Sequence, residues 1–301
     1  LGTDRLPGII TSIRNTIINA GGELLFGRRI TGITISDGRF RAVEVNGNET
    51  FRADDLILAT GHSARDIHSM LSVAGVRLAF KPFAMGVRVE HPQELIDRIQ
   101  YHGRSRGDYL PAAAYNLVSQ IGGRGVFSFC MCPGGFMVPA ATAPGEVVVN
   151  GMSPSHRNSR WANSGIVTEI REEDAIRYGT GPLAGTAFQA ALEKLAWKEG
   201  GMTQRAPAQR LTDFVEGKAS ASLPEASYFP GLTPSLLHEW LPADISARLR
   251  EGFKEFGKRM KGFITGEALV AAVESRTSSP VRVLRDPVSL HAEGIEGLWP
   301  A

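Results

Sequence analysis

The chain has 301 residues, 43% hydrophobic and 21% charged, as expected of a globular protein with one large or two moderate domains. Its 33 Lys and Arg residues nearly balance 31 Asp and Glu residues, so the net charge of +2 gives no sign of a nucleic-acid partner. No apolar run approaches the ~20 residues that cross a bilayer, and no signal peptide opens the chain. Two cysteines in a chain this long fit a reducing compartment. We therefore expect a cytoplasmic protein with no membrane partner.

The first 60 residues predict a helix followed by an antiparallel meander. Five isoleucines recur at helical spacing in residues 7–20, and two glycines end that pattern. Strand-like segments follow at 23–26, 30–35, 40–45 and 54–60. The dipeptides Asp37-Gly38 and Asn46-Gly47, which tolerate positive φ, form turns between them. The apolar run at 56–59 is typical of a strand buried on both faces.

Residues 61–66, with the sequence GHSARD, separate this strand from a helical pattern that ends at Gly75. Ser63 with Asp66 three residues later fits a capping box at the start of that helix. A hydrolase nucleophile is an alternative role for Ser63, because G-x-S-x-G between a strand and a helix forms the hydrolase elbow. However, Arg65 replaces the last glycine of that motif. In either case a helix N-terminus, with its partial positive charge, follows a buried strand.

The rest of the chain alternates short strands with two longer helices. Residues 80–170 are rich in Gly and Pro and hold β-like runs at 84–89, 125–132, 146–149 and 165–170. Helices are predicted at 186–198 and 245–260, and the apolar stripe of the second indicates core packing. Residues 217–235 favour an irregular loop, and strands return at 281–284 and 298–299.

Common cofactor and metal motifs are absent from the sequence. The fingerprint G-x-G-x-x-G does not occur. Residues 252–258 imitate a phosphate-binding loop, but Arg259 occupies the position where Ser or Thr would bind magnesium. The seven histidines lack the paired spacing of a zinc site, so we expect no metal.

The segment FSFCMCPGG at 127–135 is one candidate site. On a regular strand Cys130 and Cys132 point to the same face, and a disulfide between them would require a backbone bend. One interpretation is a pair of packed, buried thiols. The other is a face that lines a cofactor, where Gly134 and Gly135 allow close backbone approach. Nothing in the sequence indicates a lowered cysteine pKa.

The segment RTSSPVRVLRD at 276–286 is a second candidate, because it concentrates three arginines and three hydroxyl groups. A solvated charged edge would account for it. Alternatively, Ser278, Ser279 and Arg282 supply donors to a carboxylate, a phosphate or the carbonyl oxygens of a flavin ring.

Together these segments resemble a known family. An apolar strand that ends in Ala59-Thr60-Gly61 after a β-meander is similar to the segment that approaches FAD in glutathione-reductase-type flavoproteins. With residues 127–135, 150–153, 162–164 and 274–286, it resembles a group of poorly characterised NAD(P)/FAD-dependent oxidoreductases. The resemblance covers almost the whole chain.

The resemblance implies an α/β (α+β) fold in two parts. Residues 1–80 and 283–301 would form a partial FAD/NAD(P)-binding domain, and residues 81–282 an inserted substrate domain of mixed β-sheet plus helices. In that family FAD-binding motifs precede the helix at 7–20 and follow the Trp-Pro-Ala sequence at 299–301, and both are absent here. We therefore expect a fragment of an FAD-dependent dehydrogenase, inactive by itself, that binds FAD poorly or not at all and self-associates through its truncated edges.

We predict one cleft near Gly61 that holds FAD and a small-molecule substrate, with NAD(P) as a second redox partner. The predicted catalytic residues are Cys130, Cys132, Ser278 and Arg282, and the predicted FAD contacts are Ala59, Thr60, Gly61, Gly134, Gly135 and Ser279. Ser63 would cap the helix beside the flavin. Two alternatives remain open: a serine hydrolase that uses Ser63, and a ligand-binding module without catalysis.

Overall fold

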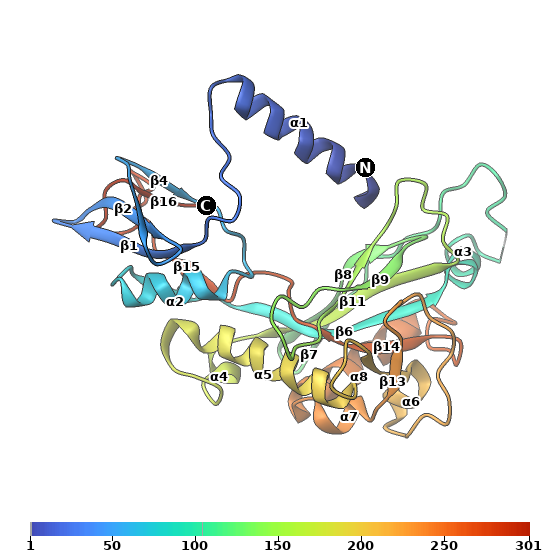
Figure 1. Cartoon of the computed structure of the whole chain (residues 1–301). Helices are drawn as coiled ribbons and strands as arrows, with labels where there is room; N and C mark the ends of the chain where they lie inside the picture. Colours follow the sequence, from blue (N-terminus) through green and yellow to red (C-terminus); the bar gives the residue numbers. More distant parts are fainter. Residues whose placement is uncertain (1, 104) are drawn as a thin grey trace. The chain divides into compact units, whose positions relative to one another are not determined.

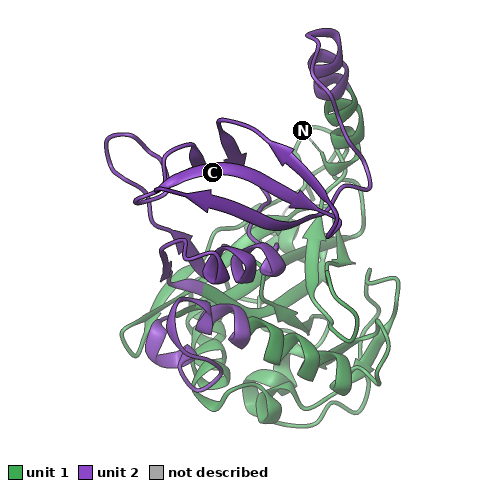
Figure 2. Cartoon of the chain, turned by 60° about the vertical axis from the view of Figure 1, so that its left-hand side comes forward, with its two compact units in different colours: residues 1–11, 84–170, 189–277 green, residues 12–83, 171–188, 278–301 purple. Residues whose placement is uncertain are grey.

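The computed structural model describes residues 2–103 and 105–301, which fold into two compact units (Figure 2). Unit 1 comprises residues 1–11, 84–170 and 189–277, and unit 2 comprises residues 12–83, 171–188 and 278–301. Residues 171–188, expected in the inserted domain, thus belong to unit 2. The mixture of sheets and helices confirms the predicted fold class, whereas the assignment of FAD to one unit and substrate to the other stays a prediction.

A mixed sheet forms the centre of unit 1. Its strands in the described residues are β6 (Phe83–Pro92), β7 (Val118–Ile121), β8 (Arg124–Cys132), β11 (Trp161–Ile170), β12 (Ala206–Arg210), β13 (Leu232–Pro234) and β14 (Leu269–Glu274). They lie in the order β13-β12-β14-β6-β11-β8-β7. β12 pairs with β13 in parallel, and β14 pairs antiparallel with both β12 and β6.

Helices cover one face of this sheet and a β-hairpin lies on the other (Figure 1). These helices are α5 (Ala184–Glu199), α6 (Leu211–Glu216), α7 (Leu237–Trp240) and α8 (Ala243–Arg259), and the hairpin pairs β9 (Phe136–Pro139) with β10 (Val149–Met152). Helix α3 (Gln93–Gln100) lies at one end of the sheet (Figure 1). Helix α8 packs on β7, β8 and β11 through its predicted apolar stripe, which is buried throughout. Gly252 allows this packing, because a Cβ there would lie 2.5 Å from Val126 of β8.

Unit 2 contains several small sheets around one apolar core. The antiparallel meander is β1 (Ile30–Ser36), β2 (Arg39–Val45) and β3 (Glu49–Arg52). β4 (Leu56–Leu58) pairs in parallel with β16 (Leu298–Pro300), and β5 (Leu78–Phe80) pairs antiparallel with β15 (Val281–Val283). The core joins residues of β2, β4 and β16 to helix α2 (Arg65–Val73).

The remaining helices are short, except for one whose residues are divided between the two units. They are η1 (Thr3–Arg5), α1 (Leu6–Asn19), α4 (Glu172–Ala175) and η2 (Gly181–Leu183). The five isoleucines of α1 have the predicted helical spacing, and all of them are exposed. Within the described ranges, no helix is both long and apolar enough to span a membrane.

Several predictions about unit 2 can be compared directly with the structure. The turns at Asp37 and Asn46 have positive φ angles, as predicted, and the strands near 56 and 298 share one sheet and one core. The segment at 23–26 is not a strand, so that prediction is wrong. The strand near residue 56 is not buried on both faces: Ile57 is 73% exposed, because side chains alternate along a strand and only Leu56 and Leu58 lie on the face that packs on the core.

Candidate functional site

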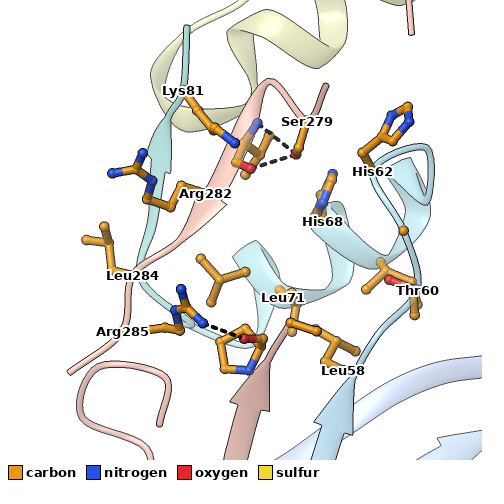
Figure 3. A pocket seen from close by; sticks show the side chains of 16 residues that line it. Leu58, Thr60, His62, His68, Leu71, Lys81, Ser279, Arg282, Leu284 and Arg285 are labelled. Carbon is orange, nitrogen blue, oxygen red and sulfur yellow. Dashed lines mark hydrogen bonds between the residues drawn. The ribbon is translucent and has the colours of Figure 1, made fainter. Parts of the chain in front are cut away.

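Unit 2 holds a cavity of about 620 Å³ at the carboxyl ends of two parallel strands (Figure 3). Leu58 of β4 pairs with Pro300 of β16 at this end. Thr60 and Gly61 follow β4, Ala301 follows β16, and all three line the cavity. In open α/β sheets ligands bind beyond the carboxyl ends of the strands, so this cavity is a candidate ligand site.

The lining of this cavity is basic. Among the described residues that line it there is no Asp or Glu, and the basic ones are His62, His68, Lys81, Arg282 and Arg285. Figure 3 shows the histidines on the α2 side and Lys81 and Arg282 on the side of β5 and β15. Arg285 Nη1 donates to the Pro300 carbonyl at 3.3 Å, whereas Lys81 and Arg282 have no ion-pair partner in the described part of the chain. Unpaired cations around a cavity suit an anionic ligand.

His68 is the buried polar side chain of the cavity. It is 8% exposed, and its Nδ1 atom has no hydrogen-bond partner in the described structure. Burial lowers the pKa of His68, and the nearby Asp66 carboxylate opposes this effect. The imidazole is therefore neutral near pH 7, and one of its nitrogen atoms remains available to a ligand.

The start of α2 corrects the predicted role of Ser63. The N-cap residue is Ala64, and no side chain caps the helix. The third helical residue is then Ile67, which has no oxygen to complete a capping box. Asp66 instead accepts a hydrogen bond from Arg29 Nη2 at 2.8 Å. Ser63 precedes the cap position by one residue, and for this reason the predicted capping box is wrong.

In unit 1, a β-bulge separates the two cysteines. Cys132 pairs with Asn163 and Phe129 with Gly165, so β8 has one residue more than β11 across this stretch. Cys130 lies in the bulge with a φ of 44°. The regular alternation of side chains is interrupted, which leaves Cys130 exposed and Cys132 buried. The interpretation of two buried thiols is therefore wrong for Cys130, and the prediction that both point to one face assumed a regular strand, which this segment is not.

Gly134 and Gly135 follow the bulge, and the close approach that they allow is to the chain's own backbone. Gly134 has a φ of 53°, and a Cβ there would lie 1.9 Å from the Arg157 carbonyl oxygen. A Cβ on Gly135 would lie 2.4 Å from the Met152 carbonyl oxygen. Both glycines are buried. Their packing explains why glycine is required here, while their predicted contact with FAD stays a prediction.

A buried arginine from β6 organises the surroundings of the bulge. Arg88 Nε donates to Glu274 Oε2 at 2.8 Å, and Nη1 donates to Asn163 Oδ1 at 2.7 Å and to the Cys130 carbonyl at 3.4 Å. Arg88 Nη2 also donates to Asn150 Oδ1 at 3.2 Å. A cation without water must be paired and hydrogen-bonded, and this one is.

The thiols beside this arginine are not activated. Loss of hydration raises the pKa of both thiols, including that of the exposed Cys130, which its neighbours cover only in part, and the positive charge of Arg88 offsets this incompletely. Both cysteines are therefore protonated near neutral pH, when the thiolate is the reactive form. Sequence reasoning missed Arg88, although its place between Val87 and Val89 was a usable signal, because an arginine inside an apolar strand needs buried partners.

The arginine-rich segment 276–286 is divided between the units. Arg276 belongs to unit 1, where Nε and Nη2 donate to the Glu193 carboxylate at 2.7 and 2.9 Å. This arginine is therefore committed to an internal ion pair. Ser279 and Arg282 belong to unit 2 and line its cavity.

Four of the predicted site residues thus come together in unit 2: Thr60, Gly61, Ser279 and Arg282. Ala59 and Ser278 belong to the same unit but do not line the cavity, and Cys130, Cys132, Gly134 and Gly135 belong to unit 1. Convergence of all these residues on one cleft stays a prediction. The sequence did not single out His68 or Lys81 as site residues, and it included Arg285 only as part of the candidate segment 276–286. No group of three or more metal-ligating side chains occurs in the residues that the structure describes.

Comparison with known proteins identifies a related family and one similar protein. The model of the family "FAD-dependent protein, C-terminal domain-like" matches residues 82–277. The whole chain is similar to an uncharacterized protein of Clostridium beijerinckii, with 41% identity over 304 residues. The chain spans 56% of the length of that relative. Neither match supports a serine hydrolase, and the glutathione-reductase-type assignment and the fragment interpretation stay predictions.

Proposed function

Because the chain belongs to the family of FAD-dependent proteins, C-terminal domain-like, we propose that it forms part of a flavin-dependent oxidoreductase. The reaction is the transfer of a hydride or an electron pair between a small-molecule substrate and FAD, with NAD(P)H as a second redox partner. The observation that carries the proposal is the family match over residues 82–277. FAD supplies the redox chemistry, and the protein binds it, orients it and excludes water.

In this proposal the unit 2 cavity binds an anionic part of FAD. Arg282 and Lys81 supply positive charge that no acid in the lining neutralises. His68 supplies the unsatisfied buried nitrogen. Gly61 has a φ of 76°, and a Cβ at this position would have no atom within 4 Å, so the backbone here is open to a ligand. These features fit a phosphate group, because arginine, lysine and imidazole are its usual partners in proteins.

This chain spans 56% of the length of its relative. The first experiment therefore uses a longer form of this protein that extends over the relative's full length. We expect it to purify with flavin absorbance or to take up FAD on reconstitution. NADH and NADPH are then added separately without oxygen, and loss of the oxidised flavin absorbance identifies the donor. A full-length protein with no flavin that also fails to take up FAD would refute the proposal. We expect the 301-residue chain alone to bind FAD more weakly.

A cavity variant tests which residues contact the cofactor. Arg282→Ala in the full-length protein removes one charge-assisted contact, so FAD affinity should fall about tenfold or more, measured by fluorescence titration. Arg77→Ala is the matched control, because Arg77 belongs to unit 2 and pairs with Glu293 outside the cavity. Equal affinities for the two variants would exclude Arg282 from the cofactor site and leave the family assignment intact.

A further inference from the structure

Unit 1 contains a cavity of about 550 Å³ between the C-terminal ends of helices α3 and α8. α3 ends at Gln100 and α8 ends at Arg259, and the last turn of each helix lines the cavity together with the residues that follow it. The described residues of this lining include no Asp or Glu. Five of them are basic: Arg98, His102, Lys258, Arg259 and Lys261. A cavity of this size is large enough for a small molecule, and its lining favours a negatively charged one.

Hydrogen bonds fix the chain at the end of α3. The Gly103 N–H donates to the Arg98 carbonyl at 2.7 Å, so the chain turns back over the last turn of the helix. The Tyr101 hydroxyl group donates to the Pro111 carbonyl at 2.8 Å, which ties the residue after α3 to a later part of unit 1. The backbone that carries Arg98 and His102 is therefore held in place.

The chain after α8 is anchored on both sides of Lys261. Met260 and Phe263 are buried. Between them, Gly262 has a φ of 92°, and a Cβ there would lie 3.5 Å from Ile99 Cδ1 of α3. The backbone after α8 thus lies against the last turn of α3, and the basic residues of both helix ends surround one cavity.

Most of the positive charge around this cavity is not neutralised by the protein. Lys258 pairs with Glu255, and Arg259 Nη1 donates to the Val118 carbonyl. The other three basic side chains are exposed and have no ion-pair partner in the described part of the chain: Arg98, His102 and Lys261. Like charges that are held together repel each other, and an anion between them removes that repulsion.

The helix macrodipoles explain part of this charge. A helix C-terminus carries a partial negative charge that basic residues of the last turn compensate. Arg98 belongs to the last turn of α3, and Lys258 and Arg259 belong to the last turn of α8. His102 and Lys261 lie beyond the helices, and the dipole effect falls off within the last turn. Compensation of the dipoles therefore does not account for these two residues.

A neighbouring cavity of about 970 Å³ in unit 1 has a different lining. It shares Arg98 and Gly103 with the first cavity. However, four acids also line it: Glu94, Asp97, Asp108 and Glu225. Of these two cavities, the one between α3 and α8 is thus the one whose described lining is suited to an anion.

We propose that the cavity between α3 and α8 binds a small molecule through a diphosphate group. Arginine and lysine are the usual partners of phosphate, arginine through a planar pair of donors and lysine as a compact charge. Because the cations come from two helix ends, a ligand with two linked phosphates contacts both ends at once. The cavity shares no lining residue with the basic cavity of unit 2, so this inference does not rest on the proposed flavin chemistry.

Titration of the 301-residue chain with inorganic pyrophosphate, followed by amide NMR shifts in roughly 0.1 M salt, tests the site. The shifts report each cavity separately, so binding in unit 2 does not interfere. We expect the amides of 98–103 and 258–262 to shift together and to give one dissociation constant. Orthophosphate should bind at these amides about tenfold more weakly, because it reaches only one helix end.

A double variant and a matched control connect this binding to the unpaired cations. Arg98→Gln with Lys261→Gln removes two charge-assisted contacts, so the pyrophosphate affinity read at these amides should fall about tenfold or more. Lys254→Gln is the control, because Lys254 is an exposed lysine of α8 that pairs with Glu251 and does not line the cavity. This control should keep the original affinity.

Three results would overturn the proposal. The first is the absence of shifts at 98–103 and 258–262 up to about 10 mM pyrophosphate. The second is an equal loss of affinity in Lys254→Gln and in the double variant, which would show a general effect of net charge. The third is orthophosphate binding as tight as that of pyrophosphate. Should the double variant not fold, Lys261→Gln alone replaces it, with an expected loss of about threefold, and an unchanged affinity there rejects the site.

Discussion

Arg88 in unit 1 and Arg282 in unit 2 both lie on strands, yet their surroundings are opposite. Arg88 is fully buried and donates to side chains and backbone of its own unit. Arg282 is exposed, lines a cavity and has no ion-pair partner in the described part of the chain. A charge whose hydrogen bonds are all made internally stabilises the fold, whereas a charge left unpaired beside a cavity is available to a ligand.

The strongest test of whether these two arginines contribute differently to stability is to replace each of them by methionine, which is unbranched and carries no charge. Arg88→Met leaves the Glu274 carboxylate buried without a partner, so unfolding free energy should fall by about 3–5 kcal/mol. Arg282→Met should change it by no more than about 0.5 kcal/mol. Urea denaturation followed by circular dichroism measures both. Similar losses in the two variants would show that the two arginines do not differ in structural role.

A double variant separates the lost pair from lost packing. In Arg88→Met with Glu274→Met, no buried charge remains, so part of the lost stability should return. If the double variant is as unstable as Arg88→Met alone, the shape of the side chains and not the buried charge determines stability at this position.

Two glycines give a smaller contrast between the units. Gly134→Ala combines a left-handed backbone with a collision against the Arg157 carbonyl, so we expect a loss of about 3 kcal/mol or more. Gly61→Ala has the same backbone strain in open space, so the loss should be about 1–2 kcal/mol. Thermal and urea unfolding measure both. An equal or larger loss for Gly61→Ala would contradict the packing described around Gly134.

The smallest expected effect concerns Ser63. Loss of a true N-cap side chain costs about 1 kcal/mol. Because Ser63 does not cap α2, Ser63→Ala should change stability by less than about 0.5 kcal/mol. Urea denaturation is again sufficient. A loss near the full capping value would restore the capping role that the sequence predicted.

The predictable parts of the fold are those with local signals. The turns at Asp37 and Asn46 follow from dipeptides that accept positive φ, and α8 follows from an apolar stripe of helical period. The central strands β12 and β14 were missed. β14 is buried on both faces and shows no alternation, and β12 contains a proline, which argues against a strand. Pairing across the sheet overrides these local signs.

The candidate site was predictable where its residues follow strand ends. Thr60, Gly61, Ser279 and Arg282 could be chosen from the sequence because they lie beside strands in polar or glycine-containing segments. The partners of Arg88 could not be chosen in this way. Glu274 is 186 residues away and Asn163 is 75 residues away, so only the folded sheet shows that they meet. The bulge at Cys130 likewise depends on its pairing with β11 and not on its own sequence.

The strand order also determines when each strand can pair with its neighbours during synthesis. β6 (Phe83–Pro92) lies beside β14 (Leu269–Glu274), and β4 (Leu56–Leu58) pairs with β16 (Leu298–Pro300). The ribosome makes β6 and β4 well before these partners. The edge of β6 that faces β14 and the edge of β4 that faces β16 therefore stay unpaired until the later strands have been made, a period in which chaperones and aggregation compete for these edges. In nascent chains stalled before residue 269, β6 should be more sensitive to protease than in chains extended past β14.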